Sequence, residues 1–96
     1  MEAELWRLSG EALLVQDEGN YLEAGRSFRS AIEAARRQSA KLFELRATTS
    51  LARLLAKQHK RDEAHAMLAD IYNWFTEGFD TADLKDAKAL LEELAT

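Results

Sequence analysis

The sequence predicts an all-α protein, and three observations carry this prediction. Of the 96 residues, 17 are Ala and 15 are Leu, whereas the β-branched aliphatics number only three, so strand formers are scarce. The chain has no Cys, which excludes a disulfide scaffold. Apolar residues recur at helical spacing in five blocks, which predicts about five helices. A chain of this length forms a single domain with a thin core.

The first two blocks predict one pair of helices. The first helix, over about residues 3–16, has the expected core stripe Leu5, Leu8, Ala12 and Val15 and ends at the polar turn 17–20. The second stripe consists of Ala24, Phe28, Ala31 and Ala35, widened by Ile32, and it ends at the polar residues 36–39. Both stripes have the spacing of three or four residues that is typical of the buried face of a helix.

The remaining blocks predict a second pair and a last helix. The third helix, over about residues 41–57, carries Leu45, Thr48, Ala52 and Leu55, widened by Leu51 and Leu54. The fourth block carries Ala64, Met67, Leu68, Ile71, Trp74 and Phe75, and the fifth carries Leu84, Ala87, Leu90, Leu91 and Leu94. We expect Trp74, Phe75 and Phe79 to pack under the last helix, and the alternative is that these aromatic side chains anchor a partner. Asp80 or Thr81 is expected to cap that helix, because a short oxygen-bearing side chain accepts hydrogen bonds from its first exposed amides.

The first pair of blocks resembles the second pair at a shift of 40 residues. The matching residues are Glu4 and Glu44, Leu5 and Leu45, Ala12 and Ala52, Leu14 and Leu54, Glu23 and Glu63, and Ala24 and Ala64. The four alanines predict close helix crossings, because only a small side chain lets two backbones approach. The chain is therefore expected to hold repeat one over about residues 3–38, repeat two over about 41–76 and a capping helix over about 81–95.

The second helix of each pair carries a related pattern. It reads Asn20-Tyr21-Leu22-Glu23-Ala24 with Phe28 and Ala31 in the first pair, and Arg61-Asp62-Glu63-Ala64 with Leu68 and Ile71 in the second. With Leu51-Ala52 and Leu55, and with Ala12 and Val15, in the first helices, this pattern resembles tetratricopeptide repeats. The chain departs from that family in its period, which is longer than about 34 residues, in its lack of Pro, in Glu11, and in His59 at the position of Gly19. The resemblance implies antiparallel helical hairpins in a right-handed superhelical stack.

A second resemblance covers nearly the whole chain. It rests on residues 44–54, on 72–81 and on 83–91, which include Tyr72-Asn73-Trp74-Phe75 and Asp83-Leu84-Lys85-Asp86. These passages are similar to the carboxyl end of large bacterial proteins known as predicted ATPases, many of which begin with a class III adenylate or guanylate cyclase domain. The resemblance implies that the chain is the terminal part of a tetratricopeptide array in a signalling protein. None of the cyclase or ATPase motifs lies within the 96 residues.

The residues themselves favour no catalytic, metal or cofactor site. His59 and His65 are six residues apart, or roughly 240° around a helix, so they do not converge on one metal ion. The four glycines stand singly, at positions 10, 19, 25 and 78, so no phosphate-binding loop is present. No serine lies in a nucleophile-elbow pattern. We therefore expect a non-catalytic segment without a cofactor.

The net charge and the hydropathy of the chain limit the classes of partner that we expect it to bind. The net charge of −4 gives no general attraction to phosphate backbones, which disfavours nucleic acid. No apolar run approaches the roughly 18 residues of a membrane span, and the chain starts without a signal-like segment. The sequence is thus expected to be cytoplasmic, with a protein or peptide as its partner.

A binding surface is the natural use of stacked hairpins, whose first helices line the concave side. The candidate partner-binding residues on that side are Trp6, Ser9, Leu13, Gln16, Arg46, Thr49, Arg53 and Lys57. Arg46, Arg53 and Lys57 would suit an acidic ligand. Trp6 and Leu13 would alternatively cover preceding repeats of the parent chain. The predicted function is an interaction or regulatory module at the end of a cyclase or ATPase-type protein, and the alternative is a small adaptor that homodimerises through its first helix.

Overall fold

A computed structural model of the chain describes residues 2–16, 18–75 and 81–95, and within these residues the protein is helical without a strand. The helices are α1 (Glu2–Gln16), the short 3₁₀ helix η1 (Glu18–Asn20), α2 (Tyr21–Arg37), α3 (Lys41–Lys57), α4 (Arg61–Tyr72) and α5 (Ala82–Ala95). The prediction of an all-α chain is confirmed. The bounds of α1, α3 and α5 agree with the predicted ranges to within about one residue.

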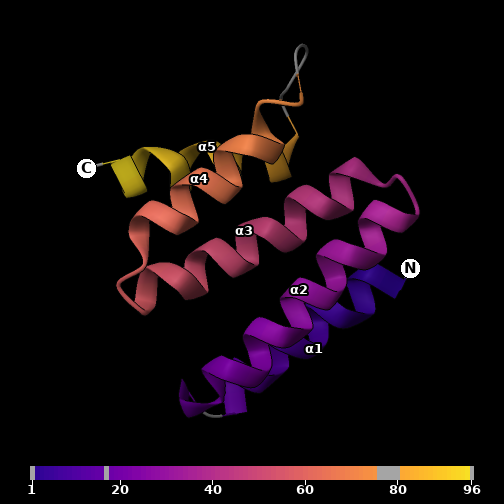
Figure 1. Cartoon of the computed structure of the whole chain (residues 1–96), viewed down its shortest axis with the longest axis vertical. Coiled ribbons are helices and arrows are strands. Elements are labelled where there is room, and N and C mark those ends of the chain that lie inside the picture. The colour runs from indigo at the N-terminus through magenta and orange to yellow at the C-terminus, as the bar shows by residue number, and fades with distance from the viewer. Residues whose placement is uncertain (1, 17, 76–80, 96) are drawn as a thin grey trace.

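Helix α3 is the centre of the molecule. It crosses between the α1–α2 pair and the α4–α5 pair and packs against all four of these helices (Figure 1). Ten of its 17 residues are buried. The largest fully buried side chains come from α2, α3 and α4: Phe28, Leu45, Leu51, Leu54 and Leu68. Because α3 is enclosed, its predicted stripe and the two leucines that widen it are all in the core.

Two turns of the same geometry join α2 to α3 and α3 to α4. Ser39 and His59 occupy the left-handed region, with φ of 55° and 64°. In the first turn the amide of Ala40 donates to the carbonyl of Ala35 at 2.8 Å, and in the second the amide of Lys60 donates to Leu55 at 2.9 Å. This six-residue hydrogen bond is the Schellman ending, which satisfies carbonyls that the helix leaves open. The two connections therefore reverse the chain in the same way.

Helix α1 packs with the face opposite to the predicted one. Leu5, Leu8 and Val15 are 69%, 52% and 87% exposed, and Ala12 is exposed as well. The predicted core stripe of the first helix is therefore wrong. The buried residues of α1 are Ala3 and Gly10.

Close approach to α2 explains this choice of face. A Cβ atom placed on Gly10 would lie 2.6 Å from Cε1 of Phe28, so only glycine fits against that ring. The small side chain of Ala3 packs with Ala34 and Ala35 of α2. A face of small residues lets the two backbones approach, and the bulky side chains of α1 then point outward. Of the four alanines predicted at crossings, Ala24, Ala52 and Ala64 are buried and Ala12 is not.

The last helix closes the core as predicted. Leu84, Ala87, Leu90 and Leu94 are buried, while Lys85, Lys88, Glu92 and Glu93 are exposed. The amide of Leu84 donates to Oγ1 of Thr81 at 3.3 Å, so Thr81 caps α5. Asp80, the other expected cap, lies outside the described residues.

The aromatic segment before α5 differs in part from the prediction. Helix α4 ends at Tyr72, and Trp74 and Phe75 follow in a turn. Phe75 is half-buried against the core, whereas Trp74 is 56% exposed. The expectation that Trp74 packs under the last helix is therefore wrong, because α4 ends before this residue reaches the core-facing side. Phe79 lies outside the described residues.

Candidate interaction surfaces

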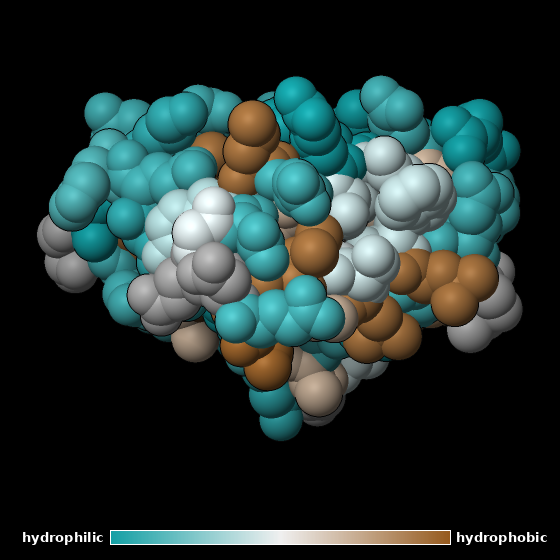
Figure 2. Space-filling view, turned by 90° about the horizontal axis from the view of Figure 1, so that it is seen from below, coloured by the Kyte–Doolittle hydropathy of each residue, from teal (hydrophilic) through white to brown (hydrophobic). Residues whose placement is uncertain are grey.

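The outer face of α1 is the largest group of exposed apolar side chains in the described part of the chain. We define this outer face as Leu5, Leu8, Ala12 and Val15. Trp6 is exposed as well, but the helical spacing places it on another side of α1. Leu22, at the start of α2, is exposed as well. Figure 2 shows a surface on which apolar side chains emerge between hydrophilic ones. Contiguous exposed apolar side chains of this kind mark contact surfaces more often than isolated ones do.

A second surface lies where α1, α3 and α5 meet, and Arg46 of α3 is at its centre. Its Nη1 donates to Oε2 of Glu4 in α1 at 3.0 Å. Its Nη2 and Nε donate to the two carboxylate oxygens of Asp83 in α5, at 2.7 and 3.2 Å. Glu4 also accepts two hydrogen bonds from Arg7. One guanidinium thus joins the first, central and last helices.

The charges in this junction stabilise one another. Hydrogen bonds from Arg7 and then from Arg46 hold the pKa of Glu4 below its ordinary value, although partial burial of the carboxylate opposes them. The bidentate contact with Asp83, together with Glu4, raises the pKa of Arg46. Both shifts favour the ionised forms of Glu4 and Arg46.

The structure separates the predicted partner-binding residues into two groups. Arg46 and Arg53 already hold carboxylates of the same chain, since Arg53 contacts Asp86 of α5 at 2.9 Å. Thr49 is buried and donates to the carbonyl of Leu45 at 2.8 Å. Leu13 is half-buried against the core. The exposed members are Trp6, Ser9, Gln16 and Lys57.

Carboxylates of α5 therefore bind the arginines of α3 that were expected to bind an acidic ligand. Asp83 and Asp86 stand one turn apart on α5 and reach two arginines on α3. The sequence contains both sets of charges, but their pairing depends on how α5 docks, which the local pattern does not encode.

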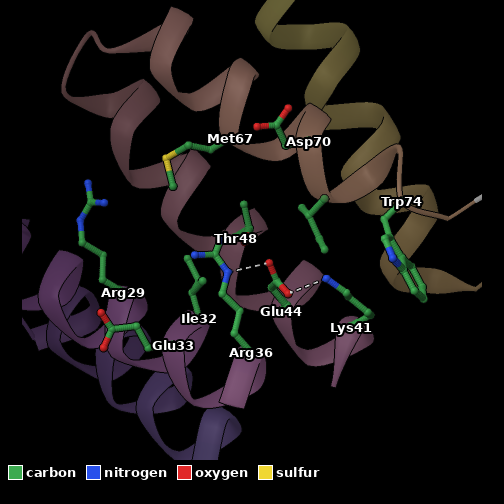
Figure 3. Close-up of a pocket in the computed structure, with 11 residues that line it drawn as sticks. Arg29, Ile32, Glu33, Arg36, Lys41, Glu44, Thr48, Met67, Asp70 and Trp74 are labelled. Atoms are coloured by element: carbon green, nitrogen blue, oxygen red, sulfur yellow. Dashed lines mark hydrogen bonds and ion pairs between the residues drawn. The ribbon is translucent and has the colours of Figure 1, made fainter. Parts of the chain in front are cut away.

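A third surface is a groove of about 330 Å³ between α2 and α4, with α3 as its floor (Figure 3). Sequence reasoning did not single it out, because its walls come from three different helices. The lining residues are Arg29, Ile32, Glu33 and Arg36 of α2, Lys41, Glu44 and Thr48 of α3, Met67, Asp70 and Ile71 of α4, and Trp74 beyond α4. Its volume is at the lower end of the range for ligand sites.

The floor of this groove holds a buried carboxylate. The side chain of Glu44 is only 6% exposed and accepts a hydrogen bond from Nε of Arg36 at 3.0 Å. Nζ of Lys41 lies 3.5 Å from the same carboxylate. Nζ of Lys41 also lies 5.3 Å from the ring centroid of Trp74, a cation–π distance. The two cations thus compensate the buried charge from opposite sides (Figure 3).

Within the described ranges, no three His, Asp or Glu side chains gather as a metal site would require. None of the described helices combines the length and the apolar character of a bilayer span. Comparisons with family models, curated proteins and solved structures find no match to this chain.

Proposed function

We propose that the chain is a non-catalytic, tetratricopeptide-like interaction module, and that it forms the terminal part of a larger bacterial signalling protein of the cyclase and ATPase type. In this proposal its hairpins continue a right-handed superhelical stack. Support comes from the sequence resemblance, from the succession of antiparallel helices, and from the contacts that α3 makes with both α1 and α5. The protein partner is a helical segment that packs on α1.

The outer face of α1 is the observation that carries the proposal. At the 40-residue shift, Leu5, Leu8, Ala12 and Val15 correspond to Leu45, Thr48, Ala52 and Leu55, which are all buried in α3. Neighbouring helices cover these positions in α3, whereas the outer face of α1 has no covering helix in the described part of the chain. Repeat helices of this type bury such faces by stacking on a neighbour. A preceding helical repeat is the neighbour of matching chemistry.

Binding in trans tests this proposal. The helical repeats encoded upstream in the same reading frame would be expressed separately and mixed with the chain. We expect a one-to-one complex that the double substitution Leu5→Glu and Leu8→Glu abolishes, because both leucines are exposed in the isolated chain and two charges would desolvate in the complex. Lys88→Glu, an exposed change on α5, is the control and should bind normally. An upstream frame without helical repeats, or a complex unaffected by the two glutamates, contradicts the proposal.

The same outer face favours one second candidate, a free-standing adaptor that homodimerises through α1. Sedimentation velocity at micromolar concentration separates the two candidates. A dimer that the Leu5→Glu and Leu8→Glu substitutions split would establish the adaptor, whereas a monomer at that concentration counts against it.

A further inference from the structure

The groove between α2 and α4 is separate from the outer face of α1, and its charges are unevenly matched. Each cation that lines it has a carboxylate of the chain as a partner. Arg29 pairs with Glu63 at 3.6 Å, and Arg36 and Lys41 share Glu44. Arg29 thus has a carboxylate of its own, whereas Arg36 and Lys41 share one, so each cation has an ion pair but one positive charge at Glu44 is in surplus.

The carboxylates of the two walls are in the opposite situation. Glu33 on α2 and Asp70 on α4 both line the groove and are exposed, and neither forms an ion pair within the residues that the structure describes. In Figure 3 they come from the two ribbons that flank the floor. The carboxylates without an ion pair therefore lie on both walls, and with Glu44 and Glu63 they place four negative charges against the three positive ones of Arg29, Arg36 and Lys41.

The apolar part of the groove provides a contact for a side chain rather than for a bare ion. Ile32 and Ile71 are buried in the walls, and Met67, a flexible and polarisable side chain, is half-buried beside them. Trp74 leaves more than half of its surface exposed at one end, and its ring already holds the ammonium group of Lys41. An exposed Trp beside a groove is a common anchor in protein interfaces.

We propose that this groove binds a basic, apolar peptide segment of a partner protein. A large apolar side chain of the segment packs against Ile32, Met67 and Ile71, and neighbouring Lys or Arg side chains pair with Glu33 and Asp70. The ring of Trp74 contacts the segment at the end of the groove. Because Glu33 and Asp70 are the lining charges without an ion pair, a basic segment gains two pairs, whereas an acidic segment meets these two carboxylates and only the one surplus positive charge that Arg36 and Lys41 share around Glu44.

Peptide binding followed by tryptophan fluorescence tests this proposal. Trp6→Phe, an exposed change on α1, leaves Trp74 as the reporter. The probes are two synthetic peptides of about 14 residues with the same Leu and Phe positions, one carrying Lys and Arg and the other carrying Glu at all charged positions. The basic peptide should shift the emission of Trp74 and saturate, and the acidic peptide should not.

Matched variants assign the effect to the wall carboxylates. Glu33→Gln with Asp70→Asn should weaken the basic peptide by about tenfold or more, since two charge-assisted contacts are lost. Glu23→Gln with Glu92→Gln changes the net charge by the same amount at exposed positions outside the groove and should have little effect. Glu33→Lys with Asp70→Lys should reverse the preference toward the acidic peptide. Far-UV circular dichroism verifies that each variant is folded.

Three results would overturn the proposal. They are equal binding of both peptides, unchanged binding by the Glu33→Gln and Asp70→Asn variant, and equal weakening by the two double variants, which would indicate a bulk charge effect. The outer face of α1, Leu5, Leu8, Ala12 and Val15, is intact in all of these variants. A negative result therefore bears on the groove alone and leaves the proposed α1 contact to its own test.

Discussion

Helices α1 and α3 have matching apolar residues at a shift of 40 positions, but they use them in opposite ways. In α3 the stripe of Leu45, Thr48, Ala52 and Leu55 is buried, and in α1 the matching residues form the exposed outer face. Helix α3 has helices on several sides, whereas α1 docks with α2 and the edge of α3. The number of neighbouring helices, as well as the apolar pattern, therefore decides which residues become core.

The largest expected effect is a direct test of this difference. Leu45→Ala removes a fully buried side chain, and we expect it to lower the free energy of unfolding by about 2–5 kcal/mol. The matched substitution Leu5→Ala, at an exposed site, should change it by less than about 0.5 kcal/mol. Chemical denaturation followed by circular dichroism measures both. Equal losses at the two sites would show that the leucines are equally buried.

The next effect concerns the face that α1 does bury. Gly10→Ala should lower the free energy of unfolding by about 1 kcal/mol, because overpacking against the Phe28 ring outweighs the better helix propensity of Ala. Gly25→Ala in α2 is the control, since its Cβ would meet Leu54 at an ordinary 3.5 Å. That change should stabilise the protein by about 0.5–1 kcal/mol through helix propensity. Stabilisation by both substitutions would contradict the close approach at Gly10.

Breaking the ion pairs that join α1, α3 and α5 should lower the free energy of unfolding by a similar amount. Arg46→Met leaves Asp83 without its bidentate partner and Glu4 with Arg7 alone, and we expect a loss of about 1 kcal/mol. Arg53→Met removes a pair in which both side chains are about half-exposed, so its effect should be close to zero. Thermal and urea unfolding of the two variants compare them. An equal effect of the two substitutions would assign the junction no special role.

A smaller change, an increase in the free energy of unfolding, is expected from substitutions in the two turns that bound α3. Ser39→Gly and His59→Gly each relieve a left-handed backbone conformation and should stabilise the protein by about 0.5–1 kcal/mol. Ser39→Ala and His59→Ala keep a Cβ atom and are the matched controls. Equal stabilisation by the alanine and glycine variants would contradict a cost of the left-handed backbone at these two residues.

The smallest effect is the pH dependence that Glu4 contributes. Its pKa in the folded protein is lower than the ordinary value of 4.5, so the folded state favours the ionised form. The resulting stability is present above pH 4.5 and is lost as the pH falls through the lowered pKa. Urea titrations at several pH values should show a shallower acid loss for Glu4→Gln than for the exposed control Glu92→Gln. An identical pH profile for the two variants would contradict this contribution.

Much of the fold could be predicted from the sequence, because periodic apolar residues and polar interruptions are local signals. The ranges of α1, α3 and α5, the buried faces of α2, α3 and α5, and the cap at Thr81 all follow from such signals. The orientation of α1 could not be predicted in this way. That helix has a stripe of large apolar residues on one side and Ala3 and Gly10 on the other, and only the shape of Phe28 selects the second.

The interaction surfaces were less accessible to sequence reasoning. The arginines of α3 were correctly singled out, but the carboxylates that hold them come from α5, 37 residues beyond Arg46. The groove combines side chains from three helices, so its unmatched charges become visible only when the helices are packed. Sequence periodicity divides a helix into faces, and tertiary packing determines which face is buried and which charged side chains remain without an ion pair.

The Arg46 junction also has a consequence for how the chain folds. Its contacts join residues that are 42 and 37 positions apart, whereas the turns at Ser39 and His59 close through hydrogen bonds between residues five positions apart. Long-range contacts require more loop-closure entropy than local ones. We therefore expect α2, α3 and α4 to associate first and the two outer helices to dock afterwards on the same guanidinium. Native-state hydrogen exchange should then show α1 and α5 opening before the central three helices.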